Sequence, residues 1–103
     1  MMDSSTPTGL SVSQFAGLRQ GPKLIILGAV HGNETCGTEA LKRLRQEIES
    51  GELCINRGTL TMVPVTNPLA YQLQRRHGDR NLNRNMSRTD DPQDFEDLVC
   101  NVL

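Results

Sequence analysis

The sequence predicts an α/β protein whose mostly parallel sheet is incomplete within this chain. Three observations predict this class: an apolar run over residues 23–30, a helical period over residues 35–51, and a second apolar stretch over residues 60–65. Strand, helix and strand in this order are typical of a right-handed crossover between parallel strands. Two parallel strands cannot shield both faces of an apolar strand, so we expect partner strands outside these 103 residues.

The first strand is predicted over residues 23–30, because an uninterrupted apolar run is typical of a strand buried on both faces. The helix after it is predicted because apolar residues recur every three or four positions, with charged residues between them and Gly51 as a stop. Its apolar positions are Ala40, Leu41, Leu44 and Ile48.

The second strand is predicted over residues 60–65. Pro64 cannot donate to a central ladder, so we place it at a strand end or a sheet edge. Asn67 followed by Pro68 predicts the start of a short helix, which continues to about Gln74.

The last third of the chain divides into a loop and a helix. Residues 75–88 are polar, with almost no candidates for the core, and predict an exposed loop. Residues 90–103 begin acidic and become apolar, as expected for a helix with negative charge near its N-terminus. Residues 1–10 are rich in Ser, Thr, Pro and Gly and are expected to be frayed, which leaves residues 11–103 as a partial α/β domain.

Composition excludes several classes of protein. A net charge of −1 and a pI near 6.1 give no overall attraction to nucleic acid or to anionic membranes, so neither is expected as a partner. The three cysteines predict no disulfide framework and no cysteine-only zinc site, which favours a reducing cytoplasm. No apolar run approaches the roughly 18 residues of a membrane span.

His31 and Glu34 are candidate metal ligands because they follow the first predicted strand directly. In open α/β sheets, ligands bind where strands end at their carboxyl edge. An H-x-x-E spacing places an imidazole and a carboxylate within reach of one Zn²⁺ ion, although catalytic zinc usually takes three protein ligands. The spacing by itself favours a different interpretation, a turn histidine beside an acidic residue at a helix start.

Residues 75–88 hold five arginines and one aspartate in a nearly neutral protein. Arg76, Asn83 and Arg84 could clamp a carboxylate or a phosphate, because guanidinium groups match planar anions through paired hydrogen bonds. The alternative is a solvated basic loop. Interleaved aromatic residues, which would favour nucleic-acid binding, are absent from this segment.

Taken together, these segments resemble the succinylglutamate desuccinylase/aspartoacylase family, zinc hydrolases related to the M14 metallocarboxypeptidases. The resemblance covers about residues 22–88, which correspond to the N-terminal part of the family's catalytic domain. It is carried by the segments 28–35 (GAVHGNET), 64–70 (PVTNPLA), 81–84 (NLNR) and by Arg76.

The resemblance implies a zinc-carboxypeptidase-like α/β/α fold and hydrolysis of the amide bond of an N-acyl amino acid. His31 and Glu34 would be two of three Zn²⁺ ligands, and Arg76 would polarise the scissile carbonyl. Asn83 and Arg84 would bind the substrate carboxylate. The third ligand and the general base are expected outside this chain, so the 103 residues alone are expected to be inactive.

One departure concerns Asn81, because the family usually has aspartate at this position. The change removes a charge that could orient a ligand or the neighbouring arginines. The alternative functions are a non-catalytic anion-binding module that uses the Arg75–Arg88 loop and an interaction fragment that completes its sheet with another polypeptide.

Overall fold

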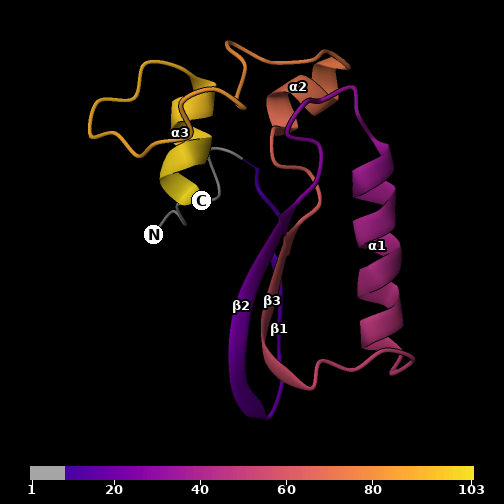
Figure 1. Cartoon of the computed structure of the whole chain (residues 1–103). Helices are drawn as coiled ribbons and strands as arrows, with labels where there is room; N and C mark the ends of the chain where they lie inside the picture. Colours follow the sequence, from indigo (N-terminus) through magenta and orange to yellow (C-terminus); the bar gives the residue numbers. More distant parts are fainter. Residues whose placement is uncertain (1–8) are drawn as a thin grey trace.

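A computed structural model describes residues 9–103 and contains one three-stranded sheet, in the order β1-β3-β2 (Figure 1). Its strands are β1 (Ser13–Ala16), β2 (Arg19–Leu27) and β3 (Arg57–Val63). β2 pairs with β3 in parallel, whereas β1 pairs with β3 antiparallel. The α/β class and the predicted parallel pair are confirmed, and the described sheet is mixed.

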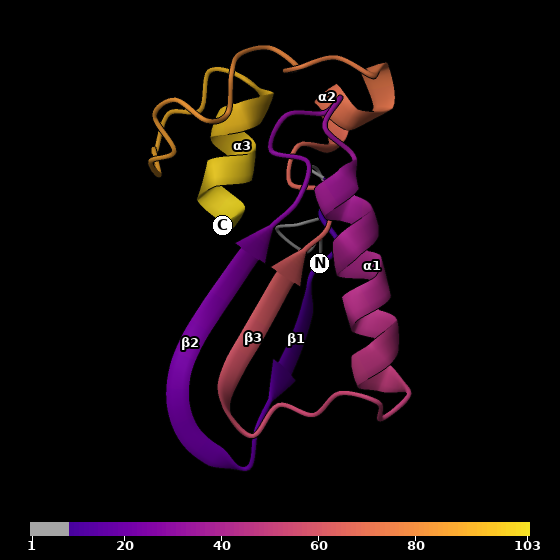
Figure 2. The same cartoon turned by 45° about the vertical axis from the view of Figure 1, so that its right-hand side comes forward.

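Three helices accompany the sheet: α1 (Cys36–Glu49), α2 (Pro68–Leu73) and α3 (Phe95–Val102). α1 runs along one face of the sheet, whereas α2 and α3 lie beyond the carboxyl ends of β2 and β3 (Figure 2). The predicted Asn67 cap is found at the start of α2, where its side chain accepts from the Ala70 backbone N–H at 3.2 Å. The Asp94 side chain caps α3 in the same way, accepting from the Asp97 N–H at 2.8 Å.

β1 is a strand that the sequence pattern did not predict. It is four residues long and has no apolar run, so its stability comes from pairing with β3. The link to β2 passes close to the start of β3, where the Gly17 N–H donates to the Gly58 carbonyl at 2.9 Å. A Cβ on Gly17 would lie 2.5 Å from the Arg57 nitrogen, so only glycine fits this crossing.

β2 differs from the predicted strand over residues 23–30 in its bounds and its burial. It starts at Arg19 and ends at Leu27, because Ala29 adopts a left-handed conformation with φ 45° that turns the chain out of the sheet. β2 forms an edge of the described sheet, and Leu24 and Ile25 are 55% and 61% exposed. An apolar run is buried on both faces only where neighbouring strands and helices cover it. Residues 9–103 do not supply enough of these elements to cover β2.

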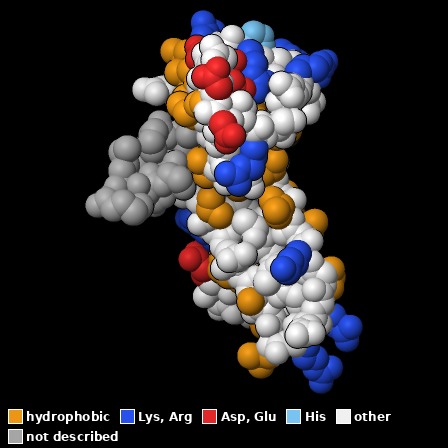
Figure 3. Space-filling model, turned by 90° about the vertical axis from the view of Figure 1, so that its left-hand side faces the viewer, with side chains coloured by type: hydrophobic (Ala, Val, Ile, Leu, Met, Phe, Trp, Pro, Cys, Tyr) orange, Lys and Arg blue, Asp and Glu red, His pale blue; other side chains and the backbone are white. Residues whose placement is uncertain are grey.

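The two faces of the sheet pack against different helices. Leu60 and Met62 of β3 meet Leu41 of α1 in one cluster on the α1 face. On the other face, Val63 packs with Val99 of α3 only at the carboxyl end of the sheet. Apolar side chains therefore remain visible on the lower part of this side in Figure 3.

The core also reaches segments that the sequence placed outside it. Leu82 lies inside the predicted exposed loop, yet it is fully buried against Val63 and Val99. The expectation of a frayed N-terminus falls mostly on residues 1–8, which lie outside the described residues, while Leu10 is buried in the same cluster. Of the helices described, none is long and apolar enough to cross a membrane.

Candidate metal and substrate site

The segments that follow β2 and β3 are joined by backbone hydrogen bonds at the carboxyl end of the sheet. The Gly28 N–H donates to the Val63 carbonyl at 2.8 Å, and the Thr66 N–H donates back to the Gly28 carbonyl at 2.8 Å. The Asn67 N–H donates to the Ala29 carbonyl at 3.1 Å. These bonds fix the turn after β2 on the loop that leads into α2.

His31 and Glu34 converge on this turn. The Glu34 backbone N–H donates to the His31 carbonyl at 3.1 Å, which brings both side chains to one side of the turn. His31 Nδ1 lies 3.1 Å from Glu34 Oε2, with the imidazole 11% exposed and the carboxylate 56% exposed. One nitrogen and one oxygen donor therefore meet at the mouth of β2, which is the donor set that zinc accepts.

Asn81 lies on the other side of the imidazole. Its Oδ1 is 2.9 Å from His31 Nε2 and accepts the backbone N–H of Asn83 at 3.0 Å. The sequence had marked Asn81 as a position that could orient a ligand, and the structure shows the histidine that it contacts.

A cavity of about 420 Å³ opens beside this pair, and the predicted substrate residues are distributed unequally around it. Asn83 lines the cavity together with His31 and Glu34. Arg84 follows Asn83, and its guanidinium donates to the Asn83 carbonyl at 2.8 Å. Arg76 is exposed and lines a separate cavity of about 260 Å³ with Arg75, His77 and Gly78.

The backbone of Arg76 is nevertheless tied to the turn that carries His31. The Gly32 N–H donates to the Arg76 carbonyl at 3.2 Å. Gly32 is buried against α2, where a Cβ would lie 2.1 Å from the Ala70 carbonyl carbon. The structure thus places the Arg76 main chain next to the candidate metal turn, while the residue lines another cavity.

Arg80 lies in the arginine-rich loop over residues 75–88, and its guanidinium is held by acidic side chains at the start of α3. Its guanidinium donates to Asp94 at 3.3 Å and to Asp97 at 2.9 Å, and it also reaches the Arg84 carbonyl at 2.6 Å. Burial lowers the Arg80 pKa, but the Asp97 hydrogen bond and the Asp94 charge outweigh it, so the pKa lies above its ordinary value. The acids of α3 thereby neutralise part of the arginine loop, and acidic and basic side chains lie together in Figure 3.

Glu96 is a further organising residue that the sequence did not indicate. Its fully buried carboxylate accepts from the Asn67 amide at 2.8 Å and from the backbone N–H of Gly78 at 3.0 Å. It also accepts the backbone N–H groups of Asp79 and Arg80 at 3.2 and 3.1 Å. Local pattern gave no signal for this, because Glu96 looks like an ordinary acidic residue in the first turn of a helix.

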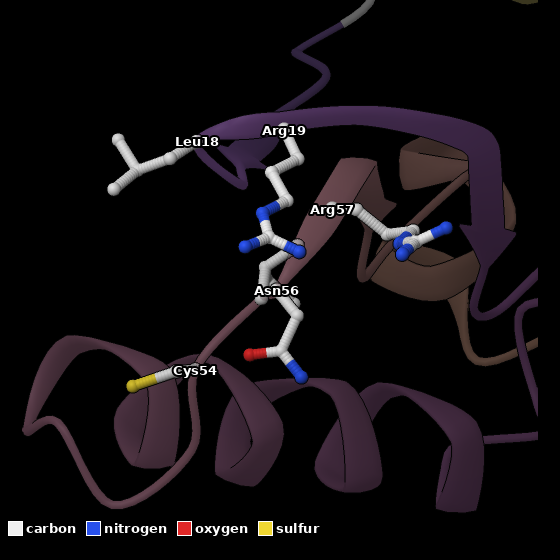
Figure 4. A pocket seen from close by; sticks show the side chains of 6 residues that line it. Leu18, Arg19, Cys54, Asn56 and Arg57 are labelled. Atoms are coloured by element: carbon white, nitrogen blue, oxygen red, sulfur yellow. The ribbon is translucent and has the colours of Figure 1, made fainter.

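A larger cavity, about 700 Å³, lies at the opposite end of the sheet, where β2 and β3 begin. Figure 4 shows Arg19 extending toward Asn56, whereas Arg57 points away from both. These polar groups do not converge on one point, so we place the candidate site at the carboxyl end of the sheet. Within residues 9–103, no three His, Cys, Asp or Glu side chains gather as a complete metal site.

The fold is that of an α/β protein with a nitrogen and an oxygen donor paired where a strand ends. The chain belongs to the succinylglutamate desuccinylase/aspartoacylase catalytic-domain family, whose model matches residues 20–99. This confirms the resemblance carried by the segments around His31, Asn67 and Asn83.

Solved structures agree with this family. An aspartoacylase family protein from Mesorhizobium loti superimposes with a TM-score of 0.78 and 30% identity, over 90% of this chain and 29% of that chain. The ectoine utilization protein EutE from Ruegeria pomeroyi gives a TM-score of 0.69 and 26% identity, over 85% of this chain and 26% of that chain.

A succinylglutamate desuccinylase/aspartoacylase from Rhodobacter sphaeroides shares the fold with a TM-score of 0.71 and 24% identity, over 86% of this chain and 27% of that chain. The chain therefore spans less than a third of the length of these relatives. Among curated protein sequences, no match to this chain is found.

Proposed function

We propose that this chain is the metal- and substrate-binding part of a zinc-dependent hydrolase that cleaves the amide bond of an N-acyl amino acid. The observation that carries the proposal is the 3.1 Å approach of His31 Nδ1 to Glu34 Oε2, beside a cavity that Asn83 also lines. Family membership supports the reaction class, because the family takes its name from two hydrolases, succinylglutamate desuccinylase and aspartoacylase.

His31 and Glu34 would hold the Zn²⁺ ion, with a third ligand and a general base from outside this chain. When bound, zinc supplies Lewis-acid polarisation of the amide carbonyl and lowers the pKa of water at the site. Two protein ligands leave a metal site incomplete, so we propose that the 103 residues alone do not hydrolyse the substrate.

The remaining residues would bind and polarise the substrate. Asn83 supplies an amide at the wall of the cavity, and Arg84 next to it supplies a guanidinium that matches a carboxylate. Arg76 would add a fixed positive charge near the scissile carbonyl, since arginine stays protonated throughout. Its side chain would have to turn from its own cavity toward His31, and the Gly32–Arg76 backbone bond keeps that distance short.

The metal half of the proposal is tested by titrating Zn²⁺ into this chain. Binding is measured by isothermal calorimetry and by the chemical-shift changes of the His31 and Glu34 side-chain resonances. We expect His31→Ala to abolish the shift of Glu34, Glu34→Gln to abolish the shift of His31, and His77→Ala to leave both shifts unchanged. A zinc-induced shift of Glu34 that is as large in His31→Ala as in the wild type would overturn the assignment.

The substrate half is tested by titrating N-succinyl-L-glutamate and N-acetyl-L-aspartate against the zinc-loaded chain. Shifts of the Asn83 and Arg84 amides are expected, with a loss of at least tenfold in affinity for Arg84→Ala because a charge-assisted bond is removed. Arg88→Ala is the matched control and should bind like the wild type.

A further inference from the structure

Two cavities lie next to each other at the end of the sheet where β2 and β3 begin, opposite the candidate site. They measure about 700 and 460 Å³ and share Leu18 and Arg19 as lining residues. Arg57 also lines the first cavity and Lys23 the second, and no described aspartate or glutamate lines either of them. We call the exposed side chains of Leu18, Arg19, Lys23 and Arg57 the base surface. It is positively charged, although the whole chain has a net charge of −1.

The positive charges of the base surface have no counter-charge among residues 9–103. Arg19 and Arg57 are register partners on β2 and β3, and like charges at paired positions of neighbouring strands repel each other. Neither these arginines nor Lys23 form an ion pair with another described residue, whereas the three basic residues of α1 each lie 3.1–3.7 Å from a carboxylate. A pair of arginines that repel each other and have no partner within the described chain indicates a partner outside it.

Gly21 makes room for the Arg57 side chain across β2. A Cβ at Gly21 would lie 2.8 Å from Arg57 Cγ, so the arginine stem occupies the space that another side chain would fill. The Leu18, Arg19 and Arg57 side chains point in three different directions (Figure 4). Because the charges are spread and do not meet at one point, the base surface fits an extended partner with several negative groups better than a single small anion.

Leu18 adds an apolar side chain to this charged surface. It is 105% exposed, so it makes no contribution to the core of the described chain. Burial of such a side chain is favourable, and protein interfaces combine apolar contacts with arginine. Nucleic acid fits the surface less well, because no described aromatic ring lines either cavity.

We propose that the base surface docks an acidic segment of another protein, one that carries an apolar side chain between its carboxylates. Arg19, Lys23 and Arg57 pair with the carboxylates, and Leu18 contacts the apolar side chain. Docking here leaves the candidate site free, since the two lie at opposite ends of the sheet. The proposal is therefore independent of zinc binding.

A second copy of this chain matches the base surface less well. Many of its acidic residues lie over residues 90–97, and Arg80 already binds two of them, Asp94 and Asp97. Carboxylates of α1 pair with basic residues of the same helix. We therefore assign a different polypeptide as the partner.

The experiment measures binding of the whole chain to a synthetic peptide that repeats Glu-Glu-Leu four times, by fluorescence anisotropy at 150 mM salt. We expect saturable binding. A double variant with Arg19→Gln and Arg57→Gln should bind about tenfold more weakly, because two exposed charge pairs are removed. The matched control carries Arg75→Gln and Arg88→Gln, which remove the same charge at exposed positions of the arginine-rich loop. It should bind within twofold of wild type.

Leu18→Ser tests the apolar part of the surface. It should weaken binding of the Glu-Glu-Leu peptide about threefold and leave binding of a Glu-Glu-Ser peptide unchanged. Neither this variant nor the Arg19→Gln, Arg57→Gln variant should lose stability in urea, since Leu18 is fully exposed and the two arginines repel each other. Loss of binding therefore cannot result from unfolding.

Equal binding by the two double variants would show general charge attraction and overturn the proposal, as would unchanged affinity for the Glu-Glu-Leu peptide in Leu18→Ser. Tighter binding of a single-stranded oligonucleotide of the same charge would assign the surface to nucleic acid instead. Self-association that the Arg19→Gln, Arg57→Gln variant loses, measured by sedimentation, would assign it to a second copy.

Discussion

The Glu96 carboxylate links three parts of the molecule through a single buried group. It accepts hydrogen bonds from Asn67 at the start of α2 and from three successive backbone N–H groups, at Gly78, Asp79 and Arg80. A buried carboxylate is tolerated only when it is fully hydrogen-bonded. Glu96 therefore fixes the segment between Arg76 and Asn83, and with it the two ends of the proposed substrate site.

We predict that Glu96→Gln destabilises the chain by about 2–4 kcal/mol, measured by urea denaturation. Glutamine keeps one acceptor oxygen but turns an NH₂ group toward two donors, which leaves buried polar groups without partners. Glu52→Gln, at an exposed position, should stay within about 0.5 kcal/mol of wild type. Equal stability of the two variants would show that Glu96 does not hold the loop.

The environment of Asp97 predicts that the free energy of unfolding decreases in acid. The backbone N–H of Gln93 and the Arg80 guanidinium lower the pKa of Asp97 below its ordinary value, so folding favours the ionised carboxylate. This contribution is present above the pKa of the unfolded chain and is lost as the pH falls through the lower folded pKa. The stability difference between wild type and Asp97→Asn should therefore shrink between pH 6 and pH 3.

Urea denaturation at several pH values checks this expectation, with Asp90→Asn as an exposed control. The difference between wild type and Asp90→Asn should stay flat over the same range. A difference for Asp97→Asn that grows as the pH falls would contradict the sign derived from the lowered pKa.

At the scale of elements, the turn after β2 depends on its close packing against α2. A Cβ on Gly32 would lie 2.1 Å from the Ala70 carbonyl carbon. The contact is with backbone atoms, which cannot move aside as a flexible side chain could. We predict that Gly32→Ala costs about 3 kcal/mol, as overpacking does, and weakens zinc binding by displacing His31. Thermal unfolding and a zinc titration measure the two effects.

Gly37→Ala is the matched control for this prediction. Gly37 lies in α1, and an added Cβ would meet only the Gly28 Cα at 3.8 Å, which is ordinary contact. Alanine is the better helix former, so this variant should gain about 0.5–1 kcal/mol. A Gly32→Ala chain as stable as Gly37→Ala would mean that the turn can move away from α2 without loss.

The sequence pattern predicted those elements that are specified by residues close to one another in the chain. The period of α1, the Asn67 cap of α2 and the acidic first turn of α3 all follow from residues within a few positions of each other. β1 was missed because its pairing with β3 involves residues more than 40 positions apart in sequence. The burial of Leu82 was missed for the same reason, since its neighbours come from β3 and α3.

At the scale of the whole molecule, the candidate site was predictable only where its residues belong to one short sequence motif. The motif around His31 and Glu34 gave a pair that the structure brings together, because both residues lie on one turn. The place of the Arg76 side chain and the engagement of Arg80 by α3 depend on how distant segments pack, which spacing does not encode. The family assignment required the motifs in combination, since each alone is weak.

The open edge of the sheet predicts how the whole molecule behaves in solution. Leu24 and Ile25 are exposed on β2, whose outer ladder has no partner strand among residues 9–103. Such an edge favours pairing with another chain. We predict concentration-dependent self-association, measured by sedimentation, that Ile25→Lys suppresses while stability stays within about 0.5 kcal/mol. Gln72→Lys adds the same charge on α2, away from this edge, and should associate like wild type. Equal suppression by both variants would assign the effect to net charge rather than to the β2 edge.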